Sequence, residues 1–162
     1  MKKQLILGMV LLLVAMSFVV PSQSASGEVI RTTYEATATN LCPGYPGCTS
    51  GEWSFPGGNF HVRDMVTIYS STSADGRVSG INTTVMSANW DASFVGVGWG
   101  TYRLESDVFD GYWKGTYTVQ MDEWGYICKI RGKGYGAFEG LQLKAIEING
   151  SVVGVISELP SH

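Results

Sequence analysis

The stretch YICKIRGKGYGAFEGLQLKAI, residues 126–146, decides how this chain folds. Its side chains alternate in character with a period of two, the pattern of a β-strand with one face toward solvent. The residues expected to point outward are Lys129, Arg131 and Lys133. Those expected to point inward are Tyr126, Cys128 and Ile130, followed on the same face by Gly132, Gly134 and Gly136. Glycine is costly inside a strand, so these glycines indicate a bend, a bulge or room for a large side chain from across the interior.

The same glycines also match a cofactor motif. Gly132, Gly134 and Ala137 satisfy G-x-G-x-x-[G/A], the spacing of a loop that holds a dinucleotide pyrophosphate. Such a loop must open a helix, because the helix N-terminus meets the phosphates. Here the chain continues as FEGLQL, residues 138–143, which is strand-like. We therefore exclude a dinucleotide site and expect no cofactor.

The chain beyond residue 25 reads as β-structure throughout. Segments rich in Thr, Val, Ile, Tyr, Phe and Trp are separated by turn signals, of which Asn149-Gly150 is the strongest. The strands expected are 29–37, 60–71, 78–87, 94–105, 112–121, 126–135, 141–148 and 152–157. They predict an all-β fold, an eight-stranded antiparallel up-and-down barrel, with a two-sheet β-sandwich as the alternative. The one long loop covers residues 38–59.

The sequence GKGYGAFEGLQ, residues 132–142, resembles the signature hairpin of the allene oxide cyclase-like and dirigent-like β-barrels. It is also similar to small exported bacterial barrels of that type with no assigned activity. The resemblance is firm over residues 111–148. It implies a calycin-like barrel with an apolar central cavity, often oligomeric. Members of the family shape a small hydrophobic molecule during cyclisation or coupling, or simply bind one.

The first 25 residues have the layout of a secretory signal peptide. Lys2 and Lys3 precede an apolar run over residues 5–20, and Pro21 and several small residues follow. The run is shorter than the ~20 apolar residues that a membrane span needs. We therefore expect cleavage near residues 24–26, no membrane span afterwards, and one domain over residues 26–162. The expected location is secreted, periplasmic or on the exterior of the cell envelope.

The charge balance bears on the partners. Without residues 1–25 the chain holds 9 basic and 14 acidic residues, a net charge of −5. Nucleic acids and anionic membranes are bound through clustered Lys and Arg, and no basic run is present. We therefore expect no nucleic-acid partner.

The cysteines indicate a disulfide. Cys42 and Cys48 bracket the tight loop CPGYPGC, a spacing that favours a local bond in an oxidising compartment. Free thiols, or a bond from either residue to Cys128, are the alternatives. Zinc needs four nitrogen or sulfur ligands, and the only histidines are His61 and His162, so no metal site is expected.

One strand segment, NFHVRDMV at residues 59–66, places a carboxylate on an apolar face. By strict alternation Asp64 shares that face with Val62 and Val66. A buried carboxylate is costly unless it is paired or protonated, so Asp64 is the weak candidate for an acid or base inside a cavity. The alternatives are a bulge that turns Asp64 outward, or an ion pair with an arginine of a neighbouring strand.

Three functions are consistent with these features. The leading one is a secreted, non-catalytic barrel that binds a small hydrophobic or amphipathic ligand inside. The residues expected to bind it are Tyr102, Trp113, Tyr117 and Tyr126. The second is a cyclase- or isomerase-like enzyme with Asp64 as acid or base. The third is a carbohydrate-binding or structural surface module that uses Trp53, Trp90 and Trp124. The sequence has no hydrolase motif such as G-x-S-x-G, and no catalytic motif of the related barrels can be aligned with it. Whether the protein is an enzyme is therefore left open.

Overall fold

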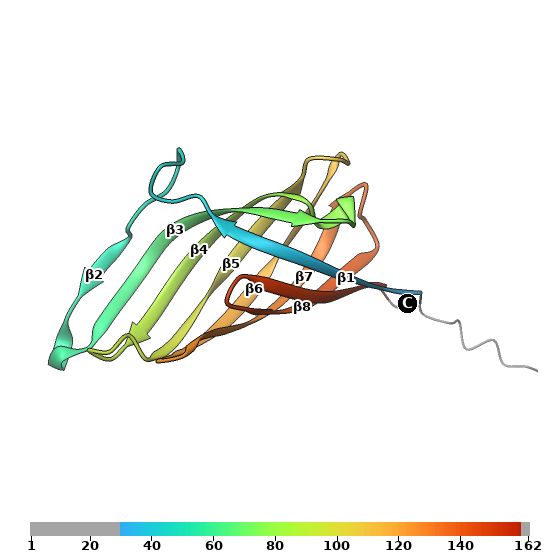
Figure 1. The fold of residues 1–162 in the computed structure, drawn as a ribbon. Coiled ribbons are helices and arrows are strands. Elements are labelled where there is room, and N and C mark those ends of the chain that lie inside the picture. The colour runs from blue at the N-terminus through green and yellow to red at the C-terminus, as the bar shows by residue number, and fades with distance from the viewer. Residues whose placement is uncertain (1–29, 160–162) are drawn as a thin grey trace, which may run out of the picture.

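The computed structural model describes residues 30–159, so the expected signal peptide lies outside the described residues (Figure 1). Nine strands form one antiparallel sheet. They are β1 (Arg31–Asn40), β2 (Glu52–Ser54), β3 (Phe60–Ser73), β4 (Gly80–Trp90), β5 (Gly96–Ser106), β6 (Gly111–Asp122), β7 (Gly125–Gly136), β8 (Leu141–Ile148) and β9 (Ser151–Glu158). The short 3-10 turns η1 (Pro56–Gly58) and η2 (Gly76–Val78) precede β3 and β4.

The sheet closes because β3 has two partners on one edge. Along the sheet the order is β1-β9-β8-β7-β6-β5-β4-β3-β2, and β1 also pairs with β3. Residues 36–40 of β1 pair with residues 69–73 of β3. The other end of β3, residues 61–63, pairs with β2. Eight strands therefore form a ring, which confirms the predicted barrel, and β2 is an additional edge strand within the long connection.

The predicted strands all occur, with each end within three residues of its expected position. In β6 the inward and outward faces alternate as the sequence indicates. The β8–β9 turn has positive φ at both central residues, 48° at Asn149 and 88° at Gly150. A two-residue type I′ hairpin requires this geometry.

Three inward glycines are closely covered by other parts of the chain. An added Cβ at Gly132 would overlap the hydroxyl of Tyr102, and one at Gly154 would overlap the ring of Tyr34. At Gly134 the added atom would collide with the backbone of Phe138. Gly132 therefore makes room for a large side chain, one of the reasons considered from the sequence, and Gly134 allows a close approach of the backbone.

A packed core fills one end of the barrel. Trp113 is 0% exposed and stacks on Phe138, with ring centroids 5.1 Å apart. The indole Nε1 of Trp113 donates to the backbone oxygen of Arg77 at 2.7 Å. Val78 of η2 is buried in the same cluster. The turn η2 and the β7–β8 turn thus cover this end.

Replacing Gly134 by alanine tests the packing at this end. We expect Gly134→Ala to lower the free energy of unfolding by about 1–3 kcal/mol, because the new methyl group meets backbone atoms that cannot rotate away. Chemical denaturation measures the change. The control is Lys133→Ala, which removes an exposed neighbouring side chain and should change stability by less than about 0.5 kcal/mol. Equal effects of the two substitutions would contradict the packing described.

Candidate ligand-binding site

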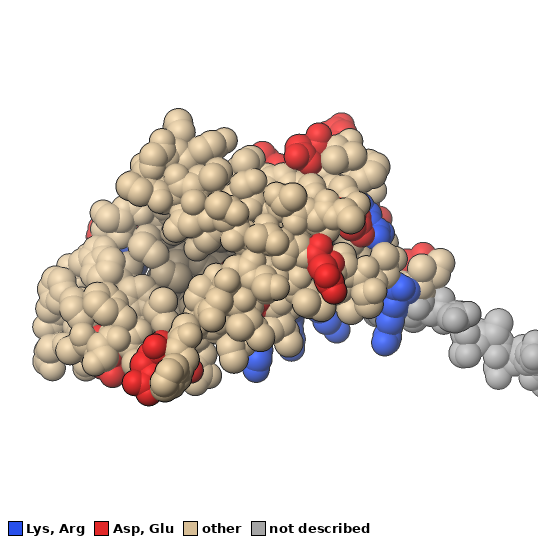
Figure 2. Space-filling view, viewed as in Figure 1, with Lys and Arg blue, Asp and Glu red and all other residues tan. Residues whose placement is uncertain are grey.

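A cavity of about 530 Å³ occupies the barrel interior. All eight strands of the ring contribute inward side chains to its wall. It opens at the end opposite the packed core, and the space-filling view is hollowed there, between β2 and the β8–β9 turn (Figure 2). Pockets for small organic molecules have volumes of roughly 300–1,000 Å³. The size of this cavity therefore suits a small ligand.

The open end of the cavity is lined by flexible and aromatic apolar side chains. Met65, Met86 and Met121 all line it, and they are the only methionines among residues 30–159. Trp90 lies beside them and packs on Phe94 at a ring-centroid distance of 6.1 Å. Methionine side chains adapt to irregular shapes, so this end can accommodate ligands that differ in detail.

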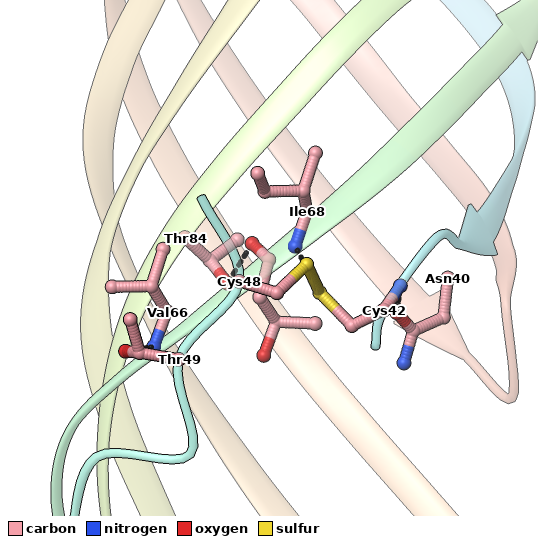
Figure 3. The surroundings of a disulfide bond; sticks show 8 residues. Asn40, Cys42, Cys48, Thr49, Val66, Ile68 and Thr84 are labelled. Atoms are coloured by element: carbon pink, nitrogen blue, oxygen red, sulfur yellow. Dashed lines mark hydrogen bonds between the residues drawn. A yellow bond between two sulfur atoms is a disulfide. The ribbon is translucent and has the colours of Figure 1, made fainter. Parts of the chain in front are cut away.

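A disulfide loop completes the wall next to β3 (Figure 3). The predicted bond between Cys42 and Cys48 is present. The backbone N–H of Ile68 donates to Cys42 Sγ at 3.3 Å, and the backbones of Thr49 and Val66 pair at 3.1 Å in both directions. Cys42, Cys48 and Thr49 line the cavity. Both ends of the loop are thus anchored to β3. They cover the part of its edge that lies between the residues paired with β1 and those paired with β2.

Three residues that line the cavity each hold a buried polar atom with no hydrogen-bond partner. The atoms are the Tyr102 hydroxyl, the Asn82 side-chain oxygen and the Trp90 indole nitrogen. Within residues 30–159 no other buried side-chain nitrogen or oxygen lacks a partner, and all three residues line this cavity. Buried polar groups in folded proteins are almost always paired, so each exception requires an explanation.

A carboxyl group also lies in the cavity wall. Tyr126 Oη donates a hydrogen bond to Glu147 Oε1 at 2.5 Å. Burial raises the pKa of Glu147 above its ordinary value of 4.5, and the hydrogen bond from Tyr126 partly opposes this. Burial, together with the charge of Glu147, also raises the pKa of the Tyr69 phenol. The cavity therefore contains one acid, whose proton is held more tightly than usual.

Cys128 is the free cysteine of the described residues, and it faces Glu147 across the β7–β8 pair. Burial, and secondarily the charge of Glu147, raises the pKa of the Cys128 thiol to about 12. A thiol with this pKa stays protonated near neutral pH and is a poor nucleophile. We therefore assign Cys128 a structural role, as one of the side chains that line the cavity.

Three of the four residues expected to bind a ligand line the cavity, namely Tyr102, Tyr117 and Tyr126. Trp113 does not, which corrects the expected placement. It shares the inward face of β6, but it lies at the packed end, where Phe138 covers it. Alternation identifies the inward face of a strand and does not give the depth of a residue along the barrel.

Asp64 requires a second correction. It is exposed, with φ of 52°, at a bulge where the β3–β4 register shifts between Val62 and Met65. The bulge adds a residue, so Met65 takes the inward position and Asp64 turns outward. Of the alternatives considered, the bulge is the one found. Asp64 is therefore removed as an acid or base of the interior.

Sequence reasoning missed Glu147, although the signal is present. Strict alternation along LQLKAIEI places Leu141, Leu143, Ala145 and Glu147 on one face. Leu143 and Ala145 are buried on that face. The rule applied to Asp64, a carboxylate on an apolar face, identifies Glu147 when it is applied to β8. Tyr34, Tyr69 and Asn82 also line the cavity and were not expected there.

The three tryptophans proposed for a carbohydrate surface have different environments. Trp90 is 7% exposed, so its expected exposure is wrong. Trp53 packs on it at a centroid distance of 6.1 Å. Trp124 is 84% exposed in the β6–β7 turn and makes no ring contact with either among the described residues. They do not form one exposed aromatic patch.

No protein-family model, curated protein or solved structure matches this chain. The likeness to allene oxide cyclase-like and dirigent-like barrels thus remains an expectation from the hairpin sequence. Within residues 30–159, no helix is long and apolar enough to cross a membrane. The same residues contain no group of three or more His, Cys, Asp or Glu side chains placed to hold a metal ion.

The raised pKa of Glu147 predicts a pH-dependent stability. The folded state holds this proton more tightly than the unfolded state, so the contribution of Glu147 to stability is complete below pH 4.5 and falls as the pH rises through the folded-state pKa. Glu147→Gln removes this titration. We therefore expect the stability of the variant relative to wild type to increase from pH 4 to pH 8, measured by urea unfolding.

Glu139→Gln, in the exposed β7–β8 turn, is the control for loss of a carboxylate. A Glu147→Gln difference that stays constant across this pH range would contradict the burial of Glu147.

Proposed function

We propose that this protein is an exported β-barrel that binds a small hydrophobic or amphipathic molecule in its interior without transforming it. The observation that carries the proposal is the cavity of about 530 Å³ with a mostly apolar lining, which includes all three residues that hold an unpartnered polar atom, Tyr102, Asn82 and Trp90. An unsatisfied buried polar group costs about 1–3 kcal/mol. A ligand whose entry turns these side chains toward it would pair with the three groups and offset that cost.

The wall chemistry favours a neutral ligand with a few oxygen functions. The Tyr102 hydroxyl and Trp90 indole can donate to carbonyl, ether or hydroxyl oxygens, and the Asn82 oxygen can accept from a hydroxyl or amine. The wall contains no Lys, Arg or His within the described residues, so an anionic ligand would have no countercharge. Methionine and aromatic side chains surround these polar points and suit an apolar body.

Export is part of the proposal. The signal-peptide layout of residues 1–25 motivates it. The Cys42–Cys48 disulfide is consistent with it, because such bonds persist in oxidising compartments. This bond anchors part of the cavity wall, so an oxidising compartment also suits ligand binding.

A cavity-filling substitution tests the binding site. Val119 points into the cavity from β6, and the adjacent Thr118 points to solvent. We expect Val119→Trp to weaken binding of the neutral fluorescent probe N-phenyl-1-naphthylamine about tenfold or more, because the indole occupies ligand volume. The matched control Thr118→Trp should leave the dissociation constant within about twofold of wild type. Fluorescence titration measures both.

Equal binding by both variants would show that the probe binds outside the barrel and would contradict the proposal. Native mass spectrometry of protein purified from its own source then identifies the natural ligand. We expect a bound small molecule whose mass is absent from Val119→Trp prepared in the same way.

A proton-transferring cyclase or isomerase is the second candidate function. The Glu147–Tyr126 pair favours it, because it places a carboxyl group of raised pKa inside an apolar cavity. In this version Glu147 takes the role first considered for Asp64. Donation and removal of a proton at carbon are reactions that such a group can support.

Glu147→Gln separates the two functions. For a binder, wild type and variant should leave a small-molecule extract of the source cells equally unchanged in composition, as measured by liquid chromatography and mass spectrometry. For an enzyme, wild type should convert one component and Glu147→Gln should not, while both still bind the fluorescent probe.

A further inference from the structure

The barrel exterior carries a concentrated positive charge that the interior function does not use. Lys and Arg side chains project along the lower edge of the molecule in Figure 2. Five exposed cations lie on the outer face of three adjacent strands, β6, β7 and β8. We call them the cationic face: Lys114, Lys129, Arg131, Lys133 and Lys144. The chain beyond residue 25 is acidic overall, so this concentration is not a consequence of composition.

The strand register places like charges directly opposite one another. Lys114 pairs with Lys133 across β6 and β7. Arg131 pairs with Lys144 across β7 and β8. Like charges at directly opposed positions destabilise a sheet, and neutral residues would avoid that cost. The two opposed pairs therefore cost the sheet stability and do not add to it.

No acidic side chain neutralises the cationic face. Within residues 30–159 the ion pairs are Arg77–Asp75 and Arg103–Glu105, and none of the five cations takes part in one. The outward side chains around them are uncharged, such as Thr116, Gln142 and the exposed Ile146. These cations are thus available to an anionic partner.

A shallow groove crosses the cationic face. Four of its cations line it, together with Tyr135, Gln142 and Leu159, and the backbone of Gly115 and Gly132 forms its floor. Tyr135 is 40% exposed and stacks on Tyr112, with ring centroids 4.9 Å apart and planes within 6°. This end of the groove therefore presents a fixed aromatic surface beside the cations.

We infer that the cationic face binds a chain of an acidic polysaccharide. Cations recur about every 6.7 Å along β7 and about every 4.8 Å across strands, which suits a polymer with repeated negative charges. Tyr135 can stack on a sugar ring, and Gln142 can hydrogen-bond its hydroxyl groups. The groove can hold a single strand of such a polymer along its length, whereas a membrane surface would contact only its rims. This site is separate from the cavity and does not depend on the proposed function.

Binding of polygalacturonate oligomers, which are linear polyuronates, tests the inference. We expect the wild-type chain without its leader to bind them by isothermal titration calorimetry, more weakly as salt increases, and not to bind neutral dextran of the same length. Lys114→Gln/Lys133→Gln/Lys144→Gln should bind roughly tenfold more weakly, the combined effect of three exposed ion pairs. The corresponding three Lys→Arg substitutions should retain wild-type affinity.

A charge-matched control distinguishes a local site from net charge. Thr37→Glu/Thr39→Glu/Thr72→Glu changes the charge by the same amount at exposed positions of β1 and β3, away from the cationic face, and it should change affinity less than twofold. Near-UV circular dichroism confirms that each variant is folded. Equal losses in the two triple variants, or no binding of polygalacturonate by wild type, would overturn the inference. Tighter binding to phosphatidylserine vesicles or to duplex DNA would also overturn it.

Discussion

Aromatic side chains that lie over cross-strand glycines determine the shape of this barrel. Tyr34 lies over Gly154 of the adjacent strand β9, and Tyr102 of β5 reaches Gly132 of β7, so a side chain at either glycine would collide with the ring. Eight strands enclose a space that side chains either just fill or leave open for one small ligand. Here both occur, because Phe138 and Trp113 fill one end while methionines and tyrosines line the other.

The strands were predictable because their signal is local. Period-two alternation and the Asn149-Gly150 turn each depend on a few consecutive residues. The position of the bulge at Asp64 was not predictable, because the bulge is in contact with a segment outside its own strand. The backbone at Gly51 packs so closely against residues 63–65 that a Cβ at Gly51 would overlap it. Neighbours of Asp64 in the sequence contain no sign of this contact.

The sequence predicted the type of site, an apolar interior lined by tyrosines, but only some of the residues that form it. Tyr117 and Tyr126 line the cavity because alternation holds in β6 and β7. The expectation of an inward carboxylate was also correct in kind, since Glu147 lies in the wall. It was assigned to Asp64, on the strand where alternation breaks. The depth that separates Trp113 from the tyrosines depends on strand stagger and the position of η2, which no single strand encodes.

Net charge proved a weaker guide to partners than the face on which the charges lie. The alternation that turns Tyr126, Cys128 and Ile130 inward necessarily turns Lys129 and Arg131 outward. Neighbouring strands in register then bring Lys144 beside Arg131. A cationic face can therefore form without a basic run in the sequence and on a chain of negative net charge. One strand pattern produces two surfaces of different chemistry, a nearly uncharged interior and a charged exterior, and each can select its own partner.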